Sequence, residues 1–176
     1  QKLFMKRTQQ NFSETFILSS FNSSLKRLKR NFIDNYLLHS PPLDELENGL
    51  GTLKKIKLKG LVNNIGFSLA NLDNIFEYLN DLDEIDIIQI PCSSTPLLLD
   101  QIYKKVEKNN TKLVLRGTYK YWKLWSSTNQ YFKKNNYGDF LKHIHLRWPK
   151  IDILFSSGNK SHLKENLNQI NLQELP

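Results

Sequence analysis

The chain has 176 residues, 39% of them hydrophobic and 11% aromatic, which suffices for one packed domain and excludes wholesale disorder. Its single cysteine, Cys92, excludes an internal disulfide and a multi-cysteine metal site, and no apolar run approaches the roughly 20 residues of a membrane span. The formal net charge of +8 could attract phosphate groups, but the basic residues are spread along the chain and we interpret most of them as solvated surface. We expect a cytoplasmic protein.

The first two elements are expected to be a helix and a strand. An apolar stripe at helical spacing follows the N-cap candidate Ser13 and consists of Ile17, Phe21, Leu25 and Leu28. The largely apolar run 32–38 then leads to His39 and is stopped by Pro41 and Pro42. Because proline cannot donate to a sheet, the strand should end at His39. Strands of this composition are covered on both faces in parallel α/β proteins, so we expect the same here.

The rest of the chain alternates in the same way. The expected helices cover residues 45–58, 71–79, 99–106, 139–148 and 160–170, and the expected strands cover 61–67, 85–90, 112–116 and 151–155, with an aromatic segment at 119–132. The residues expected to face inward from three helices are Leu72, Ile75, Phe76 and Leu79; Leu99, Ile102, Tyr103 and Val106; and Leu163, Leu167 and Ile170. Strict alternation predicts an α/β fold with about five parallel strands, each followed by a helix.

Polar residues occupy the carboxyl ends of successive strands. They are His39, Ser68, Gln89, Arg116 and Ser157. A parallel sheet would bring them to one face, where such folds place their chemistry. His39 is suited to act as a general acid or to polarise a carbonyl, or it is a strand-end histidine bonded to a loop carbonyl. Asp34 is either an inward carboxylate that needs a partner or a polar group at the strand edge.

The segment 155–166 passes from a strand through Ser157, Gly158 and Asn159 into a helix. Backbone N–H groups at a helix start, with hydroxyls and Lys160 beside them, predict an anion site. An ordinary turn with good capping residues is the alternative.

At these residues the chain resembles an aldo/keto reductase. The matching segments, in order, are Ser24-Leu25-Lys26-Arg27-Leu28 leading into Ile33 to Pro41, Asn64-Ile65-Gly66-Phe67-Ser68, Ile88-Gln89-Ile90-Pro91, and Ser157-Gly158-Asn159 with His162 to Leu167. The resemblance implies a partial TIM (β/α)8 barrel whose strands are the fourth to the eighth, over one incomplete domain at residues 1–176. It also implies reduction of an aldehyde or ketone, a small-molecule carbonyl substrate, with NADP or NAD as cofactor.

The resemblance implies roles for individual residues. His39 matches the family's histidine, which orients or polarises the carbonyl, and Ser68 and Gln89 match positions that hold the nicotinamide carboxamide. Arg116 and Gly117 stand in place of an aromatic-Ser pair that packs on the nicotinamide. Ser157, Gly158 and Asn159 match the loop that binds the adenosine phosphate, and His162 stands where the family has an Arg that binds this phosphate. Glu165 and Asn166 match residues that contact adenine.

The chain also departs from the family. The family's Tyr, Lys and Asp lie on three β/α units that have no counterpart here, Leu69 stands where Asn is usual, and Ser156 replaces a frequent Lys. Because the chain starts at Gln1, we expect it to be the C-terminal part of a longer NAD(P)-dependent carbonyl reductase. We expect it to be marginally stable alone or to self-associate through exposed barrel edges.

Other interpretations of the sequence remain open. A degenerate, non-catalytic family member acting as a binding or interaction module is the main alternative, favoured by Leu69 and by the aromatic run 119–125. Nucleic-acid binding through the basic runs and this aromatic run is disfavoured, and no membrane association is expected. A metal site at His143 and His145 is disfavoured because residues two apart on a helix face different directions.

Overall fold

The computed structural model describes residues 11–80, 82–93, 95–128, 130–134, 136–155 and 157–171. The chain forms two compact units, Gln1–Phe67 and Ser68–Pro176, and each is described by itself. Of the residues discussed above, Ser156 and the side chain of Ile170 lie outside the described part. No helix within the described ranges is long and apolar enough to cross a membrane.

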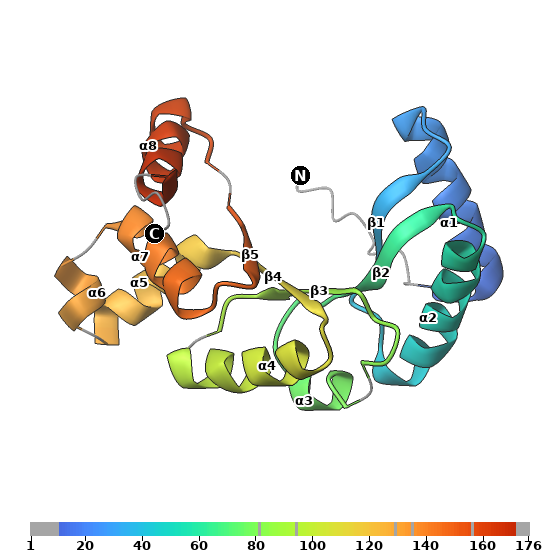
Figure 1. The fold of residues 1–176 in the computed structure, drawn as a ribbon, viewed down its shortest axis with the longest axis horizontal. Coiled ribbons are helices and arrows are strands. Elements are labelled where there is room, and N and C mark those ends of the chain that lie inside the picture. Colours follow the sequence, from blue (N-terminus) through green and yellow to red (C-terminus); the bar gives the residue numbers. More distant parts are fainter. Residues whose placement is uncertain are drawn as a thin grey trace, which may run out of the picture. The chain divides into compact units, whose positions relative to one another are not determined.

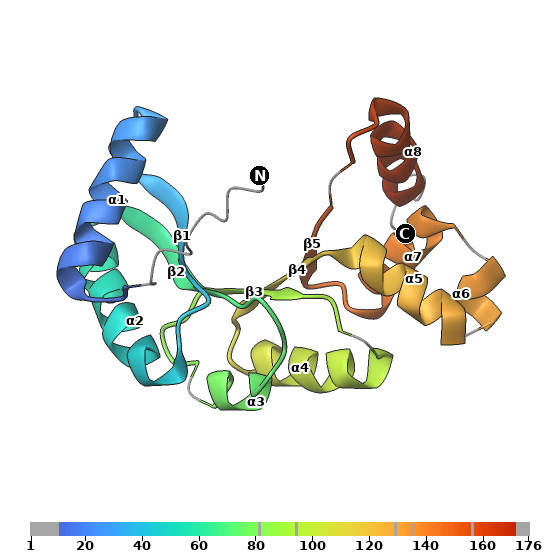
Figure 2. The same cartoon turned by 180° about the vertical axis from the view of Figure 1, so that it is seen from behind.

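The first unit consists of α1 (Glu14–Leu28), β1 (Ile33–His39), α2 (Leu43–Leu58) and nearly all of β2 (Val62–Ser68). Figures 1 and 2 show α1 and α2 on the same side of the two strands. The Ser13 side chain caps α1 by accepting from the N–H of Phe16, as predicted. Phe21 packs edge-on against Tyr36, with ring centroids 5.0 Å apart, which joins α1 to β1.

The stripe predicted for α1 is buried only in its first half. Ile17 and Phe21 are buried, whereas Leu28 is 56% exposed. The prediction was wrong for Leu28, because this residue ends the helix just before Lys29 turns into a left-handed conformation with φ 53°.

β1 is less covered than its composition predicts. Only Ile33 and Leu38 are buried, and Asp34 and Asn35 are exposed. The expectation that both faces of this strand are covered was therefore wrong. Its polar side chains are exposed to water instead. Asp34 lies 3.6 Å from the Arg30 guanidinium, which makes it a polar group at the surface and not an inward carboxylate.

β1 and β2 are neighbours in the first unit. The N–H of Ile33 donates to Leu61 O at 3.1 Å, and Asn64 Nδ2 donates to Asn35 Oδ1 at 2.8 Å. Both contacts advance in the same direction along the two strands, as parallel strands require. On the helix side, Gly49 of α2 lies so close to Leu38 that an added Cβ would stand 2.7 Å from Leu38 Cδ1. Glycine thus permits the close approach of helix and strand.

The second unit begins at Ser68, the last residue of β2. The N–H of Leu69 donates to Gln89 O at 2.9 Å, so the end of β2 borders β3 (Ile87–Pro91). β3 pairs in parallel with β4 (Lys112–Arg116), and β4 pairs in parallel with β5 (Ile151–Leu154). The strand order is β1-β2-β3-β4-β5. Consecutive strands are therefore neighbours, as the predicted α/β fold with one open parallel sheet requires.

In the described part of the second unit, these strands are accompanied by the helices α3 (Ile75–Tyr78), α4 (Pro96–Lys108), α5 (Thr118–Thr128), α6 (Gln130–Lys134), α7 (Tyr137–Arg147) and α8 (Lys160–Asn171). α3 is one turn long, so the longer helix predicted from residue 71 was wrong. Asn71 accepts from the N–H of Asp73 in a local turn, and Asn74 is left-handed with φ 53°, which stops a helix from forming earlier. Ile75 and Leu79 are buried as predicted, and Phe76 is 42% exposed.

An aromatic cluster lies within the largely aliphatic core of the second unit. Trp125, Phe132 and Phe140 are buried together, and the centroid of the Trp125 ring lies 5.3 Å from Phe132 and 5.0 Å from Phe140. α8 packs beside α7, but Leu167 of α8 is 42% exposed. The inward orientation predicted for Leu167 was wrong, because α8 has water on most of its sides.

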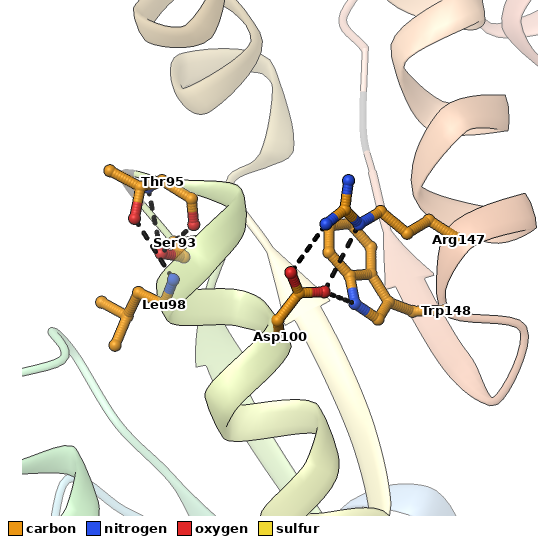
Figure 3. A network of polar contacts seen from close by, with 6 residues as sticks. All are labelled: Ser93, Thr95, Leu98, Asp100, Arg147 and Trp148. Carbon is orange, nitrogen blue, oxygen red and sulfur yellow. Dashed lines mark hydrogen bonds and ion pairs between the residues drawn. The ribbon is translucent and has the colours of Figure 1, made fainter.

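A polar network joins α4 to α7 (Figure 3). Arg147 donates to the Asp100 carboxylate from Nη2 at 2.7 Å and from Nε at 3.3 Å. The indole N–H of Trp148 donates to the same carboxylate at 2.9 Å, and Trp148 is only 1% exposed. The pKa of Asp100 lies below its ordinary value, mainly because of the hydrogen bond from Arg147. Desolvation of the carboxylate opposes this shift and raises the pKa. One carboxylate thus satisfies a buried indole donor and an arginine fork.

Candidate functional site

Two of the residues predicted at strand ends meet directly. Ser68, the last residue of β2, is buried, and its hydroxyl donates to Gln89 Oε1 at 3.0 Å. In this arrangement the amide nitrogen of Gln89 can donate and the hydroxyl oxygen of Ser68 can accept. A carboxamide carries one acceptor and one donor group, so this pair has the complementary chemistry for binding it.

Arg116 joins the same group from the end of β4. Its Nη2 donates to Leu69 O at 2.8 Å and to Ala70 O at 3.1 Å, on the turn that follows Ser68. Gly117 comes next with φ 67°, a conformation that glycine adopts without strain. Leu69 is 4% exposed, so an apolar side chain fills the position where the resemblance expects an amide.

The turn between β5 and α8 is organised by its own side chains. Ser157 Oγ accepts from the N–H of Asn159 at 3.1 Å, and Asn159 Oδ1 accepts from the N–H of Ser161 at 2.9 Å. The Asn159 carbonyl accepts from the N–H of Leu163 at 3.1 Å. Two backbone N–H groups at this helix start, those of Asn159 and Ser161, therefore donate to side chains of the turn, as in the alternative interpretation of a well-capped turn. Gly158 has open space around its Cα.

A cavity of about 240 Å³ lies beside this turn. Three aromatic rings border it, with the Tyr119 centroid 5.4 Å from that of Trp122 and 5.2 Å from that of Tyr137. Tyr137 Oη and Thr118 Oγ1 are 2.6 Å apart, and burial is the main factor that raises the pKa of Tyr137. The residues that line the cavity are Tyr119 and Trp122 of α5, Asn136, Tyr137 and Gly138 at the start of α7, and Ser157, His162, Glu165 and Asn166.

The cavity combines rings with polar edges in one place. Flat aromatic surfaces stack on planar heterocycles, and amide and carboxylate groups bind the polar edges of such rings. Four of the lining residues, namely Ser157, His162, Glu165 and Asn166, were predicted from the sequence. The aromatic rings were not, although the unusual aromatic run at 119–125 is a signal that could have identified two of them.

His39 belongs to the first unit. It is the exposed last residue of β1, and Ser40 after it is left-handed with φ 50°. The structure brings Ser68, Gln89 and Arg116 together and gathers Ser157 with the cavity residues. The prediction that His39 joins them stays a prediction.

The described residues contain no group of three His, Cys, Asp or Glu side chains that could hold a metal ion. His143 packs edge-on against the rings of Phe132 and Trp148, at 5.0 and 6.3 Å. Burial, with a smaller contribution from the charge of Arg147, lowers its pKa. Its imidazole is therefore a half-buried group beside aromatic rings.

Comparisons with known proteins agree with this architecture. The model of the aldo/keto reductase family matches residues 2–121. Aldo-keto reductase AKR11C1 from Bacillus halodurans, in its holo form, superposes with a TM-score of 0.74 at 16% identity, over 96% of this chain and 65% of that chain. An aldo/keto reductase from Brucella melitensis superposes with a TM-score of 0.67 at 18% identity, over 90% of this chain and 63% of that chain. A thermostable aldo-keto reductase in complex with the inhibitor epalrestat superposes with a TM-score of 0.68 at 23% identity, over 94% of this chain and 64% of that chain.

The chain spans about 60 to 65% of the length of the solved structures that it resembles. No curated protein matches it significantly in sequence. The structural matches cover nearly all of this chain and support the predicted partial barrel.

Proposed function

Because the chain belongs to the aldo/keto reductase family, we propose that it carries the cofactor-binding surface of an NAD(P)H-dependent carbonyl reductase. The observation that carries the proposal is the cavity beside α8. The resemblance assigns the adenosine part of the cofactor to Ser157, His162, Glu165 and Asn166. These four residues line one cavity with three aromatic rings, which suits an adenine ring with a polar edge.

At the other end of the cofactor, the Ser68 hydroxyl and the Gln89 amide would bind the nicotinamide carboxamide. The bound nicotinamide would supply a hydride to the carbonyl carbon of an aldehyde or ketone. His39 would donate a hydrogen bond to the carbonyl oxygen and hold it in place. The proton for this oxygen would come from the tyrosine of the family's catalytic group.

Binding can be measured through tryptophan fluorescence, because Trp122 lines the cavity. We expect NADH, NADPH and AMP each to quench the emission of the chain with saturation. Tyr119→Ala should weaken AMP binding by about tenfold, since stacking a base on an aromatic ring contributes roughly 1–3 kcal/mol. Tyr119 is half exposed, so the substitution should leave the fold intact.

Tyr103→Ala is the matched control, because Tyr103 lies on α4 in the lining of a different surface depression. It should leave the dissociation constants unchanged. Failure of all three nucleotides to bind would refute the proposal. Equal losses in the two tyrosine variants would refute the assignment of the cavity.

A second candidate function is cofactor binding without catalysis. It is favoured by Leu69, which is buried and apolar where the resemblance expects an amide. Joining the chain to an upstream aldo/keto reductase half that contains the Tyr, Lys and Asp separates the two functions. NADPH-dependent reduction of an aldehyde that is lost in His39→Ala supports the reductase, and tight cofactor binding without reduction supports the binding module.

A further inference from the structure

We infer that Arg116 is a positioning residue: its guanidinium fixes the turn after β2, and thereby the Ser68–Gln89 pair, from the far side of β3. The inference concerns the chain without any ligand, and only its consequence for cofactor affinity rests on the proposed function. It differs from the expectation that Arg116 contacts the cofactor itself.

The guanidinium acts on two successive carbonyl groups. Arg116 Nη2 donates to Leu69 O at 2.8 Å and to Ala70 O at 3.1 Å. The N–H of Leu69 donates to Gln89 O at 2.9 Å. Leu69 is thus held through its N–H by β3 and through its carbonyl by a side chain of β4. Both bonds to Arg116 join residues more than 45 positions apart in sequence.

Arg116 is itself held firmly enough to act as an anchor. It pairs with Pro91 in the parallel register of β3 and β4, and its carbonyl accepts from the N–H of Cys92 at 2.9 Å. Cys92 is fully buried. Because the backbone of Arg116 is fixed on β3, its guanidinium reaches the turn after β2 from a fixed starting point.

The position of Ser68 depends on this contact. Ser68 directly precedes Leu69, and its hydroxyl bonds Gln89 at 3.0 Å. Two carbonyl oxygens that point to the same place repel each other unless a donor lies between them, and a partly buried carbonyl without a donor is costly. Without the guanidinium the turn would change its conformation, and the Ser68 hydroxyl would move relative to Gln89. An arginine suits this role because its planar guanidinium presents several N–H donors in a fixed geometry.

The inference is tested with Arg116→Met, which keeps most of the side-chain length and removes the donors. Lys112→Met is the matched control, because it removes one positive charge from the other end of the same strand. The first readout is amide hydrogen exchange in the chain without cofactor. We expect exchange at residues 69–71 to become about tenfold faster in Arg116→Met, in line with the loss of a charged hydrogen bond, and to stay unchanged in Lys112→Met.

The second readout is a double-mutant comparison of NADH binding. Ser68→Ala should raise the dissociation constant in the parent chain and have little further effect in Arg116→Met, because the arginine acts through Ser68. Unchanged exchange at residues 69–71 would overturn the inference, and so would an increase spread evenly over β3 and β4. Fully additive effects on NADH binding would overturn it as well. If no variant binds NADH, the proposed function fails and the exchange data alone decide the role of Arg116.

Discussion

Asp100 offers a strong test of how the second unit is held together. Its carboxylate accepts from Arg147 at 2.7 Å and from the indole N–H of Trp148 at 2.9 Å. Trp148 is 1% exposed, whereas the side chains of Arg147 and Asp100 are 45% and 27% exposed. Replacing Asp100 by alanine therefore removes one buried and one partly solvated interaction.

The two losses differ in size. A buried indole N–H without an acceptor costs about 1–3 kcal/mol, and a partly exposed ion pair contributes roughly 0.2–1 kcal/mol after screening by solvent. We expect Asp100→Ala to lower the free energy of unfolding by about 2 kcal/mol. Asp100→Asn keeps an oxygen for the indole and should cost about half as much.

Urea unfolding monitored by circular dichroism measures these differences. Glu107→Ala is the control on the same helix, because Glu107 makes an exposed ion pair with Lys150 at 3.4 Å, and its loss should cost less than 1 kcal/mol, on the scale of about 0.2–1 kcal/mol for such pairs. In a Trp148→Phe background the indole donor is absent, so Asp100→Ala should lose most of its effect. An undiminished effect in that background would refute the assignment of the main cost to the indole.

The pH dependence follows from the lowered pKa of Asp100, which the hydrogen bond from Arg147 causes in the main. Because the folded-state pKa lies below the unfolded value of about 3.9, the contribution is complete at neutral pH and is lost as the pH falls through the folded-state value. The stability difference between the parent chain and Asp100→Asn should therefore shrink on acidification below about pH 4. A difference that stays constant down to pH 2 would contradict this account.

Three further predictions concern single sites. Gly51→Ala should stabilise the chain by about 0.5–1 kcal/mol, since Gly51 lies in a helix with open space for a methyl group. Gly49→Ala should stabilise less or destabilise, because the added Cβ would meet Leu38. Equal effects of the two substitutions in urea unfolding would contradict the close approach of Gly49 and Leu38. His162→Arg should strengthen NADPH binding by about tenfold through the 2′-phosphate and leave NADH unchanged, and equal shifts in the two dissociation constants would refute this. Burial raises the pKa of the Cys92 thiol to about 12, so its labelling by a disulfide reagent at pH 8 should follow the opening rate of the protein and not reagent concentration.

Much of the sheet could be predicted because residues that disfavour strands, such as proline, lie close to the strand ends. β4 occupies the predicted residues 112–116, and β1 ends at His39 before two prolines. The meeting of Ser68 with Gln89 also follows from the sequence, because Ser68 ends β2 and Gln89 lies on β3, the next strand in the sheet. These features depend on local chemistry and strand order.

What could not be predicted depends on tertiary packing or on local competition. The apolar spacing after residue 71 is helical, yet asparagine side chains form a competing turn there and shorten α3 to Ile75–Tyr78. The cavity beside α8 depends on Tyr137, which lies at the start of α7 and far from the aromatic run in sequence. Periodicity also could not show that Leu28 and Leu167 face water, since a stripe indicates a face but not what covers it.

The amide pair between Asn35 and Asn64 has a consequence for how the chain reaches its native pairing. β1 presents few buried side chains, so a slip of two residues against β2 would keep its sidedness and forfeit little apolar burial. Such a slip would set Asn35 opposite Gly66, which has no side chain to answer the amide. The slipped pairing would lose this hydrogen bond of 2.8 Å. The contact between Asn35 and Asn64 therefore favours the native register of β1 and β2.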